Sequence, residues 1–131
     1  MTVIATDKTR LSQLIKKEHW SEVAYCRELV TVNDTAGTLE IGQVLGQVTV
    51  GGKYKRAVET AVDGSKVAAG VVLAVTTIAG ATDTQVLVLK RGPASVSKAG
   101  LVLDATYDDA TKKGVVYTSL QALGIQVLEA V

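Results

Sequence analysis

The sequence has few of the side chains on which catalytic and metal sites depend. Its 131 residues contain no phenylalanine and only one cysteine, one histidine, one proline and one tryptophan. The single cysteine, Cys26, cannot form a disulfide within the chain, so the fold does not require an oxidising compartment. A tetrahedral zinc centre needs more cysteine and histidine ligands than the chain contains. We therefore predict no metal site and no cofactor.

The sequence also lacks an excess of charge of either sign. Fourteen Lys and Arg residues face 13 Asp and Glu residues, and the formal net charge is +1. No overall field attracts nucleic acid, acidic substrates or a membrane surface. The basic residues at 53, 55 and 56 are typical of a charged hairpin tip. We expect no direct nucleic-acid partner.

Long apolar runs are missing as well. The longest, residues 67–75, contains a glycine and is much shorter than the roughly 18 residues that a membrane helix requires. Residues 1–10 have no apolar stretch of the kind that follows the basic start of a secretory signal. The sequence predicts neither a membrane span nor a cleaved signal.

The remaining chemical groups do not form a recognisable catalytic or ligand-binding motif. His19 lies in a polar segment and Cys26 in the middle of a predicted strand, where cysteine behaves as a small hydrophobic residue. Asp104, Asp108 and Asp109 lack the spacing of a calcium-binding EF-hand loop, and helix capping explains them better. We therefore predict no catalytic residues and no enzyme activity.

Two glycines could be mistaken for a phosphate-binding loop. Gly42 and Gly46 lie in the segment TLEIGQVLGQVTV, which has a strand pattern on both sides of the glycines. Phosphate-binding glycine loops stand between a strand and a helix. The glycines therefore predict bends or bulges of a small barrel.

Valine, alanine and glycine dominate instead, a composition that favours short strands and close backbone packing. Turns are predicted at Gly51-Gly52 and Asp63-Gly64. Asp108 or Asp109 predicts the start of a helix that ends near Gly124. The fold class is therefore mostly β with a C-terminal helix (α+β), in a compact β-barrel-like domain. The strand-like segments are residues 23–32, 38–50, 53–58, 67–78, 85–90, 94–97 and 125–127.

Residues 9–20 differ from the rest of the chain. Leu11, Leu14 and Ile15 recur at helical spacing in an otherwise polar segment that ends at Trp20. Two interpretations remain open: a short helix folded onto its own domain, or an arm that contacts a partner. Aromatic residues such as Trp20 favour contact. We divide the chain into an N-terminal arm at 1–22 and one β-rich domain at 23–131.

Several sequence segments, in their order and spacing, resemble the head decoration (cement) proteins of tailed bacteriophages, in particular the lambda type. The resemblance spans most of the chain. The segments that carry it are YCRELVTVN at 25–33, GTLEIGQVLGQVT at 37–49, GKY at 52–54, DGSKVAAGVVL at 63–73, LVLKRGPASV at 87–96 and ALGIQVL at 122–128.

This resemblance implies a β-tulip-like structural domain without enzyme activity, cofactor or small-molecule substrate. Proteins of this family form homotrimers at three-fold sites of an expanded phage head, where they hold the major capsid protein together against the pressure of packaged DNA. The implied location is the outer capsid surface of a virion, after synthesis in the host bacterial cytoplasm. In the family an N-terminal arm adds a strand to a capsid-protein sheet. The corresponding segment here is residues 2–20.

We expect this arm to carry the capsid contacts. Exposed apolar side chains near a chain terminus reduce solubility unless a partner covers them. The predicted capsid-binding residues are Leu11, Leu14, Ile15 and Trp20. The alternative function is a small β-barrel module that binds a ligand or carbohydrate on Trp20 and the tyrosines. Clustered tyrosines would favour that alternative, and dispersed tyrosines would favour a cement protein.

Overall fold

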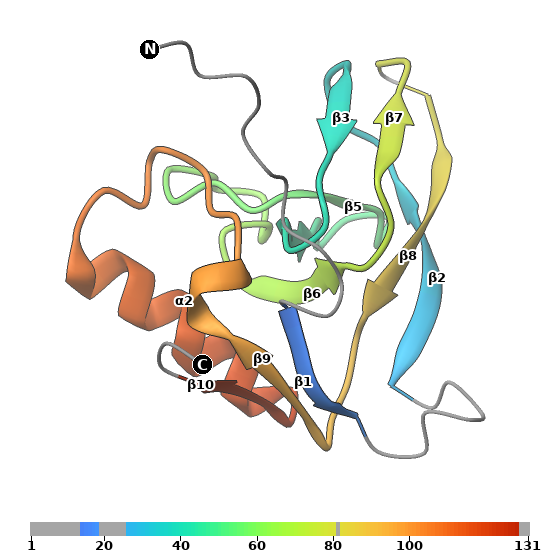
Figure 1. Cartoon of the computed structure of the whole chain (residues 1–131). Helices are drawn as coiled ribbons and strands as arrows, with labels where there is room; N and C mark the ends of the chain where they lie inside the picture. The colour runs from blue at the N-terminus through green and yellow to red at the C-terminus, as the bar shows by residue number, and fades with distance from the viewer. Residues whose placement is uncertain (1–13, 19–25, 81, 129–131) are drawn as a thin grey trace, which may run out of the picture.

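A computed structural model of the chain describes residues 14–18, 26–80 and 82–128. Within them a small closed β-barrel lies next to a three-stranded sheet and one long helix, α2 (Figure 1). The predicted fold class, mostly β with a C-terminal helix in a compact barrel-like domain, is confirmed.

The barrel is built from five short strands that close in the order β2-β5-β4-β6-β8. Neighbouring strands are antiparallel, except that β2 and β5 run parallel and share one register pair, Val32 with Tyr54. Alternating valine and leucine side chains fill the interior, as strand periodicity requires. The strands are β2 (Arg27–Val32), β4 (Val44–Gln47), β5 (Tyr54–Arg56), β6 (Ala68–Val72) and β8 (Thr84–Leu89).

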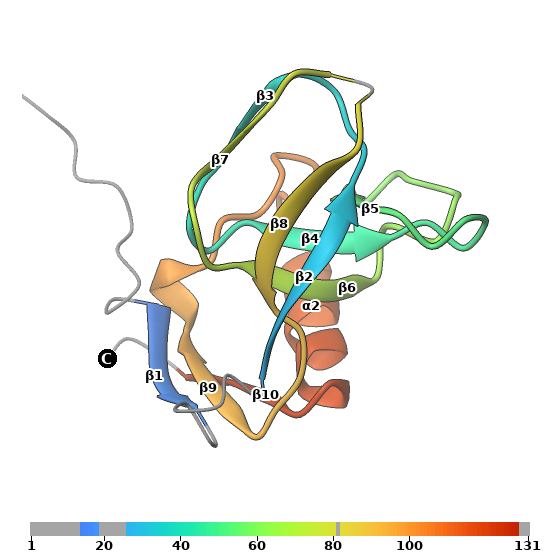
Figure 2. The ribbon, with the colours of Figure 1, turned by 90° about the vertical axis from the view of Figure 1, so that its right-hand side faces the viewer.

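A two-stranded sheet extends the barrel at one end. Its strands, β3 (Gly37–Leu39) and β7 (Thr76–Ile78), are antiparallel. Both views show the pair at the end of the molecule away from β9 and β10 (Figures 1 and 2). Leu39 and Ile78 are buried in the same apolar cluster as the barrel interior. The pair therefore covers one mouth of the barrel.

The second layer contains β1 (Ile15–Glu18), β9 (Ala94–Ser97) and β10 (Ile125–Leu128), in the order β1-β9-β10. Strand β9 is antiparallel to β1 and parallel to β10. Helix α2 (Ala110–Ala122) packs against β6 and β10, and a short 3-10 turn, Lys98–Gly100, follows β9. A second apolar cluster joins this layer to the barrel and includes Leu14, Leu89, Val96, Leu120 and Ile125.

Glycines stand where two backbones approach too closely for a side chain. A Cβ atom on Gly46 would collide with the carbonyl group of Ser65, and one on Gly92 would collide with the carbonyl group of Gly124. The first contact brings β4 against the loop before β6, and the second brings β10 against the start of β9. The expected bend at Gly42 is also present, with a φ of 97° between β3 and β4.

Three predicted elements differ from the structure. The helical spacing in residues 9–20 is wrong for Ile15–Glu18, which form strand β1 because β9 offers them a hydrogen-bonding partner far along the chain. Residues 38–50 and 67–78 each hold two strands, since the chain passes from the barrel to the β3–β7 pair. The helix starting after Asp109 and the strands at β8, β9 and β10 are confirmed, with shifts of one residue at some ends.

Candidate functional site

The four predicted contact residues fall into two groups. Leu11 and Trp20 lie outside the described residues. Leu14 is 0% exposed and belongs to the cluster between the barrel and the three-stranded sheet, and Ile15 packs against that cluster from β1. Leu14 therefore fills the core of its own domain in this structure. The expectation that it is an exposed apolar side chain does not fit this position.

Among the strands formed by the described residues, β1 is an edge strand of the three-stranded sheet. Ile15 pairs with Val96 and Glu18 pairs with Ala94, with a register shift between Ile15 and Lys17. All four residues of β9 are buried, so β9 is the central strand and β1 covers one side of it. An edge strand leaves one row of backbone donors and acceptors for a further strand. The N-terminal region thus ends in a backbone edge of the kind used for β-augmentation.

The side chains considered for catalysis serve the fold where they are described. His19 lies outside the described residues. Cys26 is 0% exposed, and its Sγ donates a hydrogen bond to the carbonyl oxygen of Pro93 at 3.5 Å. Among the residues with described positions, no group of three or more His, Cys, Asp or Glu side chains could hold a metal ion.

The acidic residues before α2 include the predicted helix cap and an ion pair that was not predicted. Asp109 is the N-cap and accepts a hydrogen bond from the backbone N–H of Lys112 at 2.8 Å. Asp108 pairs with the Lys112 ammonium at 2.9 Å, and this contact lowers the pKa of the Asp108 carboxyl group. Asp104 accepts hydrogen bonds from the backbone N–H and hydroxyl of Thr106. The prediction of helix capping is confirmed at Asp109.

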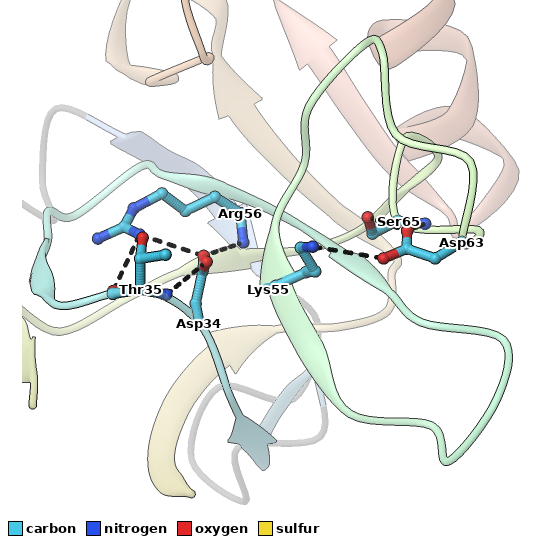
Figure 3. A network of polar contacts seen from close by, with 6 residues as sticks. All are labelled: Asp34, Thr35, Lys55, Arg56, Asp63 and Ser65. Atoms are coloured by element: carbon cyan, nitrogen blue, oxygen red, sulfur yellow. Dashed lines mark hydrogen bonds and ion pairs between the residues drawn. The ribbon is translucent and has the colours of Figure 1, made fainter. Parts of the chain in front are cut away.

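The basic residues in β5 and just before it are held in ion pairs. Arg56 donates from Nη1 and from its backbone N–H to Asp34 Oδ2, at 3.1 and 2.9 Å (Figure 3). These bonds lie next to the single register pair between β2 and β5, so they strengthen the parallel seam that closes the barrel. Lys53 pairs with Asp83 at 3.0 Å. A hydrogen bond from Asn33, and then this ion pair, lower the pKa of the Asp83 carboxyl group.

Asp63 joins the two loops on either side of β5. Its carboxylate accepts hydrogen bonds from the hydroxyl and backbone N–H of Ser65 and pairs with Lys55 Nζ at 3.3 Å (Figure 3). Its own carbonyl oxygen accepts a hydrogen bond from the backbone N–H of Thr49 at 2.9 Å. The contacts of the carboxylate with Ser65 and Lys55 lower the pKa of Asp63 to about 2, the Ser65 hydroxyl being the largest cause. The two loops therefore form one connected unit.

The tyrosines within the described residues do not form a shared platform. Tyr54 is 4% exposed in the barrel core, and Tyr107 is 4% exposed in the other cluster. The Tyr107 hydroxyl donates to the carbonyl oxygen of Lys66, whereas the ring of Tyr117 lies 4.8 Å from Lys98 Nζ. Tyr107 and Tyr117 both line a small cavity, but Tyr107 is buried and only Tyr117 is partly exposed. This distribution favours a cement protein over a carbohydrate-binding module.

One surface feature was missed by the sequence analysis. Val50 is 86% exposed and Val62 is 100% exposed, on the two loops that Asp63 joins. Val67 and Val115 are also more than half exposed and line an open groove between β6 and α2. No local signal in the sequence indicated it, because the two loops, residues 48–53 and 57–67, contain four charged residues among 17, a share similar to the 21% of the whole chain.

No helix in the described part of the chain has the length and apolarity required to cross a membrane.

The arrangement above defines a small β-barrel module with a sheet and a helix on one side, whose ionised groups brace loops and helix ends. A family model for bacteriophage lambda head decoration protein D matches residues 4–125. Since the match covers most of the chain, the chain belongs to this family. No curated protein matches the chain significantly.

Family membership confirms the resemblance to phage head decoration proteins that the sequence segments indicated. The chain is a capsid decoration protein of a bacteriophage head, and it associates with the phage capsid in the virion. Decoration is a structural role and not an enzymatic one. The fold fits this role, because two apolar clusters and a closed barrel give a rigid body to place on a shell.

Proposed function

We propose that the chain forms homotrimers at three-fold positions on the outer surface of an expanded phage head. There it binds the major capsid protein, holds neighbouring subunits together and stabilises the shell against the pressure of packaged DNA. The observation that carries this proposal is the family match over residues 4–125. Synthesis in the host bacterial cytoplasm is part of the same proposal.

Physical considerations support attachment by many modest contacts. A shell presents identical sites, and a symmetric trimer engages one site with three copies of the same surface. Each additional engaged copy raises the effective concentration of the others, so avidity replaces strong individual contacts. The net charge of +1 also lets many copies lie close together without strong mutual repulsion.

We propose further that the N-terminal region makes the capsid contact. Leu11 and Trp20 remain proposed contact residues, and so does Ile15, which is only partly buried. Leu14 is 0% exposed and could contact the capsid only if β1 left the cluster that it covers. A contact that keeps β1 in place would use the edge of β1 that no other described strand pairs with, and the residues before it. The proposed arm, residues 1–22, therefore includes a strand, β1, that packs on the domain.

The structure determines how this contact should be tested. Deletion of residues 2–20 would remove Leu14 and β1 and expose the core, whereas deletion of residues 2–13 keeps both. We expect the 2–13 deletion to melt at the temperature of the full chain and to bind expanded heads at least about tenfold more weakly, equivalent to about 1.4 kcal/mol. Co-sedimentation with heads that lack the protein measures this binding. Unchanged binding would contradict the proposed contact.

A further inference from the structure

Two loops form an exposed apolar tip at one end of the barrel. Residues 48–53 connect β4 to β5, and residues 57–67 connect β5 to β6. We call Val50 and Val62 the valine tip, because they are 86% and 100% exposed on these adjoining loops. Figure 2 shows both loops at the right, beyond the ends of β4 and β5.

The valine tip is held in place by polar contacts. The backbone N–H of Thr49 donates to the carbonyl oxygen of Asp63 at 2.9 Å, so the residues next to Val50 and Val62 are bonded to each other. The first loop is closed by a hydrogen bond from Val48 N–H to the Lys53 carbonyl at 2.8 Å. Both valines are therefore presented on a braced scaffold, which lowers the entropic cost of binding through them.

An apolar groove lies close to the same loops. It has a volume of about 680 Å³ and runs between the start of β6 and one face of α2. We call it the α2 groove; its walls include Val67, Ala68, Val115, Thr118 and Ala122. A Cβ atom added to Gly114 would meet no other atom within 4 Å, so the surface at Gly114 is open.

The valine tip and the α2 groove match in chemistry. None of the residues that line the groove is charged, and neither is any residue in 48–52 or 60–62. Within the described residues, six large apolar side chains are exposed, and four of them are the two valines of the tip and the two of the groove. Depletion of charge and concentration of apolar area characterise the centre of a protein interface.

We infer that the valine tip of one copy of this chain inserts into the α2 groove of the next copy. A head-to-tail contact needs two different, complementary surfaces on the same chain, and it closes into a ring when the rotation between copies allows it. The chain carries both surfaces, and residues 62–67 connect them directly. A contact with the capsid protein would need only one of them.

This inference rests on the proposed function only for the number of copies in the ring and for the shell on which it assembles. The contact itself is a property of the chain. It explains why Val62 is fully exposed at the end of a braced loop, and why Val67 and Val115 face an open groove: in the assembled ring each pair is covered by the other.

A photo-crosslinking experiment tests the contact. A benzophenone amino acid replaces Val62, whose complete exposure makes the change neutral for folding. The protein is bound to expanded heads, irradiated and digested, and the crosslinked peptides are identified by mass spectrometry. The variant is mixed with parent protein labelled with ¹⁵N before it is bound, and the expected product joins position 62 of the unlabelled variant to a labelled peptide of residues 110–122, which therefore comes from another copy.

Two variants of the groove separate assembly from folding. Gly114→Leu fills the open surface beside Val115 and is expected to lower the crosslink yield by about tenfold, because the incoming valine loses its space. Leucine also favours the helix more than glycine does, so the melting temperature should not fall. Leu29→Ser, which removes an exposed apolar side chain from β2, is the matched control and should leave the yield unchanged.

The outcomes distinguish the inference from the proposed function. A crosslink from position 62 to the capsid protein would overturn the inference and leave the decoration role intact. Protein that does not bind heads would contradict the proposed function, and the same irradiation at high protein concentration would then decide the inference alone. There, a crosslink to residues 110–122 of another copy supports it, and its absence overturns it.

Discussion

At the scale of single residues, Asp63 is the residue that connects the two loops on which the valine tip lies. Its pKa is about 2, below the ordinary value of 3.8, because the Ser65 hydroxyl, the Ser65 N–H and the Lys55 ammonium group favour the charged carboxylate. Desolvation acts in the opposite direction and is outweighed. A carboxyl group with a lowered pKa in the folded state stabilises that state while it is ionised.

The pH dependence follows from the sign of this shift. The contribution of Asp63 to the free energy of unfolding is fully present above about pH 4 and is lost as the pH falls from the unfolded value of 3.8 through about 2. The Asp63→Asn variant lacks this contribution, so it should be less stable than the parent at pH 7 and approach the parent at pH 2. Urea denaturation of both proteins across this range measures the difference. A difference that does not change with pH would contradict the assigned role.

Residue patterns predicted some of these positions well. Either Asp108 or Asp109 was expected to cap α2, and Asp109 does so; the prediction succeeded because capping depends on a few adjacent residues. The exposure of Val50 and Val62 could not be predicted, since valine in a β-rich chain normally indicates a buried position. Only the contact between Thr49 and Asp63, which are distant in sequence, places the two valines on adjoining loops.

Strand β1 is the element whose placement bears most on the proposed capsid contact. Leucine and isoleucine at positions 11, 14 and 15 fit a helical spacing, yet residues 15–18 pair with β9. A short apolar pattern does not distinguish helix from strand when the deciding partner lies about eighty residues away in the chain. Helix α2 was predictable because its cap, its stripe at Val116 and Leu120, and Gly124 are all local signals.

Truncation of Leu14 tests whether β1 is docked in the free protein. Leu14 is 0% exposed in the cluster that contains Val96 and Ile125, so Leu14→Ala should lower the free energy of unfolding by about 2–5 kcal/mol. The control Leu29→Ala removes a side chain that is 61% exposed and should change it by less than about 0.5 kcal/mol. Chemical denaturation measures both. Equal and small effects would mean that β1 does not pack on the free domain.

At the scale of the whole molecule, the order of the sequence segments indicated the family, and the family model confirms it over residues 4–125. The barrel class was also predictable, because valine-rich segments separated by glycine turns favour short strands. The division of strands between the barrel and the β3–β7 pair was not, since it depends on the pairing of β3 with β7, which lies far along the chain.

The described part of the chain is a compact module, and its decoration role requires only that it be placed on a shell. Its ion pairs brace loops and its apolar clusters hold the barrel, the sheet and α2 together. Attachment then depends on two surfaces: the N-terminal region with β1, proposed to contact the capsid, and the tip and groove, proposed to connect neighbouring copies. Each surface can be altered without changing the other.

The number of copies bound to each three-fold position of saturated, expanded heads tests the central claim most directly. Expanded heads that lack the protein are saturated with it, and the bound mass is measured together with the density at the three-fold positions by electron cryomicroscopy. The account predicts three copies at each position and heads that resist heating better than bare heads. Absence of binding, or binding at other positions without added heat resistance, would contradict it.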